Sequence, residues 1–183
     1  TPSAATVKHT DRCLSCLSCM TTCPASVDYM HLVDETRNRI EKNYARPFSD
    51  QLLRELLIKV LPNPKIFRLT LLGARFTKLL APVLPGRLKS LLQMVPKTIP
   101  PASDMDLPQV FPANGPRKMR VALMTGCAQR VLRPSINEAT IRLLTRYGCE
   151  VIVTNGIGCC GALAHHMGKE KNAISSALAN IKA

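Results

Sequence analysis

Hydrophobic residues recur at helical spacing through the first half of the chain. In residues 27–43 the apolar positions favour one face of a helix: Val27, Met30, Leu32, Val33 and Ile40. Similar patterns cover residues 50–60, 66–80 and 88–95, and prolines at positions 62, 64, 82, 85 and 96 bound these segments. Because proline interrupts a helix, the pattern predicts several short helices. Residues 1–12 are polar, and we expect them to be extended or short-helical.

The middle of the chain is rich in proline. Residues 96–118 contain six prolines, which disfavour both a helix and a central strand. This segment is therefore predicted to be an extended linker, or a strap over another surface, at a domain boundary.

The pattern changes again after Met119. Residues 120–125 and 149–154 are short apolar runs that predict strands. Between them, Ser135 and Glu138 match a capping box at the start of a helix that should end at Gly148. Another helix is predicted near residues 169–182. Strand, helix, strand and helix in this order predict parallel strands joined by a right-handed crossover, so the chain as a whole is assigned to the α+β or α/β class.

Composition and charge narrow the choice of partners. Aromatic residues make up only 4% of the chain, with no Trp, so the core must be aliphatic. The net charge is +13, and no acidic residue lies between Glu55 and Asp104. The cations there alternate with aliphatic residues instead of aromatic ones that could stack on bases, which argues against nucleic acid. A lipid or protein surface fits better, although a helical bundle with its cations facing water has the same pattern.

The sequence contains no pattern typical of a membrane span. Residues 151–168, the longest uncharged run, contain too many polar residues and glycines for one.

The strongest chemical signal is a run of cysteines followed by proline. Cys13, Cys16, Cys19 and Cys23 precede Pro24, with the spacing that bacterial-type ferredoxins use for a 4Fe-4S cluster. A zinc site built from two C-x-x-C pairs usually separates them by about a dozen residues or more, whereas these four cysteines lie within eleven positions. Disulfide bonds would need an oxidising compartment, and the residues before the motif do not resemble a signal peptide.

A second cysteine group follows the two predicted strands. Cys127 comes after the first strand, and Cys159 and Cys160 come after the second. Adjacent parallel strands lie ~5 Å apart, so the three thiols should converge at one edge of the sheet, where ligands of α/β proteins gather. A second cluster or redox site is the prediction, with inert buried cysteines as the alternative.

One further cysteine and three histidines have less specific predicted roles. Cys149 starts a predicted strand and is expected to be a small core residue. His31 is expected to be a surface or hydrogen-bonded histidine. His165 and His166 either donate to a sulfur or to a partner's cofactor, or are ordinary hydrogen-bonded histidines.

Three stretches carry a family resemblance: CLSCLSCMTTCP with the following SVDYMHLVDETR, then MTGCAQRVLRPSINEAT, and VTNGIGCCGALAHHMG. They resemble the ferredoxin-type, CCG-domain family of iron-sulfur proteins. This family includes the iron-sulfur subunits of glycolate oxidase (glycolate dehydrogenase) and of anaerobic glycerol-3-phosphate dehydrogenase, and heterodisulfide reductase subunits. The cysteine run is specific for the cofactor, and the CCG signature is specific for the family.

The resemblance implies an electron-transfer subunit of an oxidoreductase complex. One or two 4Fe-4S clusters would be on this chain, and FAD on flavoprotein partner subunits that oxidise a 2-hydroxy acid such as glycolate. Electrons would pass to a membrane quinone or another acceptor, with the chain in the cytoplasm and peripheral on the inner membrane. We expect no catalytic residue here, because the chain has no GxGxxG fingerprint and no acid/base constellation. A heterodisulfide-reductase-like subunit and a basic zinc-binding interaction module remain the alternatives.

Four segments follow from this interpretation. They are a ferredoxin-type segment (residues 1–48), a basic amphipathic helical region (49–95), the Pro-rich linker (96–118) and a partial CCG domain (119–183). Members of the family resemble two-cluster ferredoxins with paired CCG modules, so a chain with one of each is expected to be a fragment. Cys23 would then bind a neighbouring cluster, or it completes a single four-cysteine site. Cys127, Cys159 and Cys160 would share their cluster with cysteines beyond Ala183.

Overall fold

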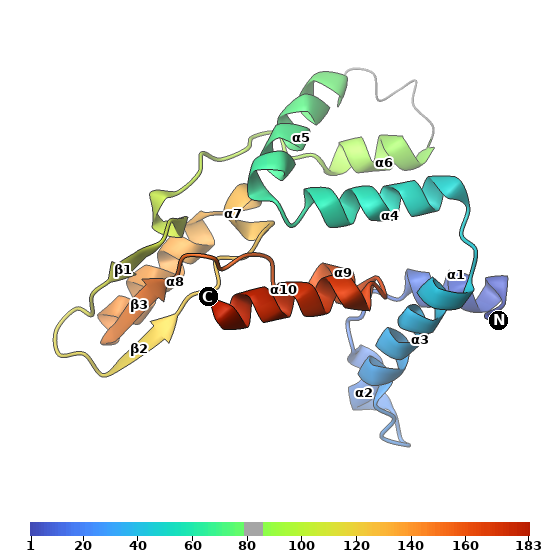
Figure 1. Ribbon diagram of the computed structural model, residues 1–183, viewed down its shortest axis with the longest axis horizontal. Coiled ribbons are helices and arrows are strands. Elements are labelled where there is room, and N and C mark those ends of the chain that lie inside the picture. Colours follow the sequence, from blue (N-terminus) through green and yellow to red (C-terminus); the bar gives the residue numbers. More distant parts are fainter. Residues whose placement is uncertain (79–85) are drawn as a thin grey trace. The chain divides into compact units, whose positions relative to one another are not determined.

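The computed structural model describes residues 1–78 and 86–183 (Figure 1). The chain divides into two compact units. The first unit contains Thr1–Ile58 and Gly161–Leu178, and the second contains Lys59–Cys160 and Ala179–Ala183. Neither unit is one continuous segment, because the chain returns to the first unit after the CCG signature. The division into four segments, which was inferred from the sequence, stays a prediction.

The first unit is built from helices. Its elements are α1 (Ala4–Arg12), α2 (Ser18–Thr22), α3 (Tyr29–Asn43), most of α4 (Phe48–Val60), α9 (Ala162–His166) and most of α10 (Glu170–Lys182). Val7 on α1 and Val33 and Ile40 on α3 are buried, so a helix with a buried face is present as predicted. The predicted face is correct only in part, because Leu32 is 53% exposed and Val27 precedes the helix. The N-terminal residues 1–12 are short-helical, and the Ser3 hydroxyl accepts a hydrogen bond from the Thr6 N–H at their start.

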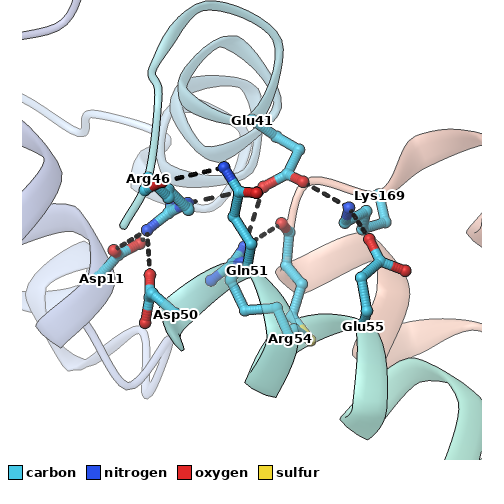
Figure 2. A network of polar contacts seen from close by, with 9 residues as sticks. Asp11, Glu41, Arg46, Asp50, Gln51, Arg54, Glu55 and Lys169 are labelled. Carbon is cyan, nitrogen blue, oxygen red and sulfur yellow. Dashed lines mark hydrogen bonds and ion pairs between the residues drawn. The ribbon is translucent and has the colours of Figure 1, made fainter. Parts of the chain in front are cut away.

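Charged residues join the helices of this unit in a network (Figure 2). The buried Arg46, between α3 and α4, donates to Asp11 Oδ2 of α1 at 2.6 Å and to Asp50 Oδ2 of α4 at 3.2 Å. Glu41 of α3 accepts from Arg54 of α4 at 3.4 Å and pairs with Lys169, which precedes α10, at 2.6 Å. Since the loss of one partner from a buried pair costs ~3–5 kcal/mol, this network fixes how α1, α3 and α4 meet.

The second unit combines helices with a small sheet. Its helices are α5 (Pro64–Thr77), α6 (Gly86–Met94), the short η2 (Asp104–Asp106), α7 (Gln129–Leu132) and α8 (Ser135–Arg146). Phe67 and Leu71 of α5 pack with Val95 and Val131 in one core cluster.

The helices predicted over residues 50–60, 66–80 and 88–95 are present as α4, α5 and α6, with modest shifts at their ends. Pro64 opens α5 at its first position, because its fixed φ suits a helix start and the missing N–H costs nothing there. The predicted end at Leu80 and the breaks at Pro82 and Pro85 lie outside the described residues.

The sheet has three strands in the order β1-β3-β2 (Figure 1). β2 (Met119–Ala122) pairs with β3 (Cys149–Val153) in parallel, with Val121 opposite Val151. This confirms the strand-helix-strand prediction, and α8 forms the crossover. Ile141 of α8 packs with Cys149 and Val151 of β3 in a second core cluster, so Cys149 is the core residue we expected.

One strand was not predicted. β1 (Gln109–Phe111) lies inside the Pro-rich segment and pairs antiparallel with β3, so the sheet is mixed and not purely parallel as predicted. Pro108 and Pro112 flank this three-residue strand, which occupies an edge of the sheet. Proline excludes a central strand but tolerates an edge, which explains the difference. The α+β assignment is confirmed.

The capping box predicted at Ser135 is wrong. α8 starts after Pro134, Ser135 is already helical, and no side chain caps this end. Pro134 has a φ of −58°, which is ready for a helix, so the helix starts one residue before the hydroxyl could act as a cap. The predicted stop is correct, because Gly148 follows α8 with a φ of +86°.

Among the described residues, no helix has both the length and the apolar composition needed to cross a bilayer.

Candidate metal centre

The four N-terminal cysteines lie in one loop around α2. Cys13 follows α1, Cys16 lies between the helices, Cys19 is in α2, and Cys23 follows it. All four are free thiols; Cys16 and Cys19 are exposed, and Cys13 and Cys23 are half-buried. The loop therefore presents its thiols near the surface of the first unit, where the cluster predicted from the sequence would sit.

The backbone of this loop is unusual. Ser15 and Leu17 have φ values of 51° and 59°, a region that residues other than glycine seldom occupy. Each lies directly beside Cys16, so the chain bends back on itself between successive cysteines. The bend turns the Ser15 N–H toward Cys13 Sγ, at 3.4 Å. Such N–H donors to sulfur are a feature of protein iron-sulfur sites, where they tune the cluster.

Backbone donors also favour thiolates at two of these positions. A backbone hydrogen bond from Ser18 lowers the pKa of Cys16, and the Ser18 side chain adds to the effect. Backbone hydrogen bonds from Val27 and Ala25 lower the pKa of Cys23. A thiolate is the form that binds a metal, so the donor set and the loop fit an iron-sulfur cluster.

Arg37 of α3 fixes the cysteine loop through two hydrogen bonds. Its Nη1 donates to Ser15 Oγ at 2.7 Å, and its Nη2 donates to the Cys13 carbonyl at 2.5 Å. The residue is 8% exposed, so it puts a desolvated cation next to the backbone of the cysteine loop. Sequence reasoning missed Arg37, although its position four residues after Val33 and three before Ile40 put it on the buried face of α3.

The second cysteine group follows the parallel strands of the second unit. Cys127 lies beyond β2, in a loop whose Thr125 carbonyl accepts a hydrogen bond from the Asn137 amide at 2.9 Å. Asn137 is buried on α8 and also donates to Asp106 Oδ1 at 2.6 Å. Burial raises the pKa of Asp106, against the opposing hydrogen bond from Asn137. These polar groups fix the backbone just before Cys127.

The other two thiols of this group follow β3. Asn180 of α10 accepts from the Gly158 N–H at 2.9 Å and donates to the Cys159 carbonyl at 2.9 Å. Cys159 is half-buried and Cys160 is exposed. Asn180 thus clamps the loop that carries both thiols, and no sequence signal pointed to it.

The cysteine sulfurs do not form the tight set that surrounds a single ion. Among the residues described, three ligand atoms of separate side chains lie within 4.8 Å of one another only at Asp34, His165 and His166. His165 and His166 therefore have a carboxylate partner on α3, a contact that the sequence did not indicate. His31 is exposed and pairs with Asp28 at 3.5 Å, in agreement with its expected surface role.

Comparison with known protein families finds a match in the C-terminal part of the chain. Residues 121–183 match the family profile named CCG, the cysteine-rich domain. The C-terminal part of the chain is thus similar to this cysteine-rich domain. The match covers the end of β2, all of β3 and both loops that hold Cys127, Cys159 and Cys160, so the second cysteine group belongs to the matched region.

The similarity to whole proteins extends over nearly the entire chain. A glycolate oxidase iron-sulfur subunit from Escherichia coli is 38% identical over 97% of this chain and 40% of its own length. A probable glycolate oxidase iron-sulfur subunit from Bacillus subtilis is 30% identical over 93% of this chain and 41% of its own length. Lactate utilization protein A from Halalkalibacterium halodurans is 37% identical over 30% of this chain and 22% of its own length. The resemblance found in the sequence is confirmed, and the chain spans about two fifths of the length of the first two relatives. No solved structure matches.

Proposed function

We propose that this chain is an iron-sulfur electron-transfer segment of a flavin-dependent 2-hydroxy-acid oxidoreductase, with glycolate as the expected substrate. Its similarity to glycolate oxidase iron-sulfur subunits over 97% of its length supports this proposal. The observation that carries it is the cysteine loop, in which Cys13, Cys16, Cys19 and Cys23 are free thiols with backbone donors near them. A 4Fe-4S cluster held there would supply one-electron transfer.

The residues around the loop have separate tasks in this proposal. The four cysteines bind the iron, and the N–H of Ser15 donates to sulfur and so stabilises the reduced, more negative state. The buried Arg37 fixes the loop and adds a positive charge, which also favours reduction. The exposed Cys16 and Cys19 mark the side from which a redox partner can approach.

A second cluster at the CCG loops completes the proposed path. Cys127, Cys159 and Cys160 would be its ligands from this chain. The Asn137 and Asn180 hydrogen bonds support this role, because they hold both loops at defined positions beyond the parallel strands. The substrate would be oxidised on a flavoprotein partner subunit carrying FAD, and electrons would leave to a membrane quinone or another acceptor.

The relay role can be separated from substrate oxidation. In the assembled complex, Cys16→Ser should remove iron and abolish electron transfer to an external acceptor, while glycolate still reduces the flavin of the partner. Cys149→Ser is the matched control, because Cys149 is a core residue at the start of β3 that belongs to neither group of proposed ligands, so its replacement should leave transfer intact. Normal transfer in the Cys16 variant would refute the relay. Zinc in place of iron would favour the zinc-binding module.

We further propose that α5 docks the complex on the cytoplasmic face of an anionic membrane. One face of this helix is buried through Phe67 and Leu71, yet the opposite face carries a second apolar stripe. Its members are three or four residues apart and are 46%, 71%, 41% and 80% exposed: Ile66, Leu69, Leu72 and Phe76. Exposed apolar residues beside Lys65 and Arg75 are the composition of an interfacial helix.

Two other cations, Arg68 of α5 and Lys78 directly after it, form hydrogen bonds within the protein. Arg68 donates to the Pro100 carbonyl at 2.5 Å, and Lys78 donates to the Val95 carbonyl at 3.0 Å, so both fix the segment that follows α6. A docking test must therefore leave them in place. Leu69→Ser with Phe76→Ser should strongly reduce cosedimentation with phosphatidylglycerol vesicles, and Lys65→Gln with Arg75→Gln should do so at low salt. If both double variants cosediment with the vesicles as strongly as the unaltered complex does, α5 does not dock on a membrane.

A further inference from the structure

One carboxylate of the first unit faces two histidines. Asp34 Oδ2 lies 3.2 Å from His165 Nε2, and Asp34 Oδ1 lies 3.1 Å from His166 Nδ1. The two imidazole rings are 5.3 Å apart between centroids and tilted by 58°. Asp34 comes from α3 and the histidines from α9, so more than 130 residues of chain separate the two sides of the contact.

The two imidazoles and the carboxylate are side chains of the kinds that bind metal ions. In a neutral imidazole, one ring nitrogen carries a proton and the other has a free lone pair for a metal ion. Asp34 presents one oxygen to each ring, and its side chain is 11% exposed. Arg37 Nη1 lies 3.7 Å from Asp34 Oδ1 and helps to hold the carboxylate in place.

The spacing suits a metal ion. The three ligand atoms lie within 4.8 Å of one another. An ion bound ~2.0–2.2 Å from each atom would place them about 3–4 Å apart, which small side-chain rotations can reach. Gly168 allows the close approach behind this site, because a Cβ there would collide with the Arg37 carbonyl of α3.

An open cavity adjoins two of the three side chains, Asp34 and His165. It has a volume of about 290 Å³, and Asp34 and His165 line it together with His31, Glu35, Asn38, Gly168 and Glu170. The Asn38 Oδ1 atom is buried and has no hydrogen-bond partner among the described residues. A metal ion at the histidines would thus keep coordination positions open toward water or a small ligand, with an unpaired acceptor oxygen close by.

We propose that Asp34, His165 and His166 bind a divalent transition-metal ion, with Zn²⁺ as its first candidate. Two imidazole nitrogens and one carboxylate oxygen suit Zn²⁺ and its neighbours in the first row, whereas Ca²⁺ and Mg²⁺ prefer oxygen ligands throughout. The ion would join α3 to α9. Through Arg37, which contacts both Asp34 and the Cys13 carbonyl, it would also brace the cysteine loop.

Calorimetric titration of the full chain with Zn²⁺, after anaerobic iron loading, tests the proposal. The unaltered chain should bind about one Zn²⁺ at this site. His165→Ala with His166→Ala should weaken that binding by more than ~100-fold, since even the indirect partners of ligands are worth ~10–100-fold. His31→Ala is the matched control and should bind Zn²⁺ as before, because it removes an imidazole of the same cavity outside the three ligands. Equal affinity in the double variant and the unaltered chain would overturn the proposal.

A second measurement needs no variant. X-ray absorption at the zinc edge of the Zn²⁺-loaded chain should show nitrogen and oxygen neighbours at ~2.0–2.2 Å, whereas a cysteine site gives sulfur at ~2.3 Å. A shell dominated by sulfur would contradict the proposal. The iron content of the same sample is measured separately, so a failure of the iron-sulfur assignment and a failure of this zinc site give different results.

Discussion

Arg37 donates a hydrogen bond to the carbonyl oxygen of Cys13, with 2.5 Å between the Nη2 and O atoms. The contact joins the middle of α3 to the first cysteine of the loop. The planar guanidinium has several N–H donors, so the same side chain also donates to Ser15 Oγ. The loop conformation and the positive charge next to the loop thus depend on one buried side chain.

Replacement of this side chain should affect both properties. Arg37→Gln leaves the Cys13 carbonyl and the Ser15 hydroxyl without their donor, which should lower the free energy of unfolding by about 1–3 kcal/mol. It also removes a buried positive charge, so the midpoint potential of the proposed cluster should become more negative. Urea unfolding and a redox titration check the two effects.

Arg39→Gln provides the comparison. Arg39 is exposed and pairs with Glu35 one turn away, and exposed ion pairs of this kind contribute little to stability. If both variants shift the potential equally, or neither does, Arg37 has no special role at the loop.

Gly168 should tolerate no side chain. It has a φ of +75°, and an added Cβ would collide with the Arg37 carbonyl, which belongs to backbone and cannot swing away. Gly168→Ala is therefore expected to destabilise the fold by more than about 1 kcal/mol. Gly73→Ala in α5, where an added Cβ meets nothing within 4 Å, should instead stabilise the chain by ~0.5–1 kcal/mol. Thermal unfolding of the two variants measures the contrast, and a loss of the same size at both positions would contradict the close approach.

Asp106 should make stability depend on pH. Burial raises the pKa of its carboxyl in the fold, so the folded chain binds this proton more tightly than the unfolded chain. The stability contributed by the protonated group is complete below its unfolded pKa of about 4 and is lost as pH rises through the higher folded value. Asp106→Asn keeps an acceptor for Asn137 and removes the charge, so its stability relative to the unaltered chain should increase from acid to neutral pH.

The exposed Asp104 of the same short helix is the control for this effect. Unfolding of Asp104→Asn, followed over the same pH range, should run parallel to that of the unaltered chain. A constant difference between Asp106→Asn and the unaltered chain would show that burial does not perturb this carboxyl.

The sequence predicted those parts of the structure that depend on local pattern. The burial of Val33 and Ile40 on α3, the parallel pair of β2 and β3, and the core position of Cys149 follow from residue spacing and hydrophobicity. The edge strand β1 did not, because three residues between prolines carry no periodic signal and pair only because one edge of β3 is free.

The contacts that support the candidate sites depend on tertiary structure. Asp34 meets His165 and His166 across more than 130 residues, and Asn180 clamps the Cys159 carbonyl from a helix at the far end of the chain. Polar residues of this kind are common on helix surfaces, so the sequence offers no reason to single them out. Arg37 is the exception, since a cation on a buried helical face calls for a partner.

The iron and acid-labile sulfide content of the anaerobically purified chain tests the central claim most directly. The account predicts about four irons and four sulfides at the N-terminal loop, lost in Cys16→Ser and kept in Cys149→Ser. Purified chain that holds zinc on these sulfurs, or in which Cys13, Cys16, Cys19 and Cys23 form disulfides and bind no iron, would contradict it.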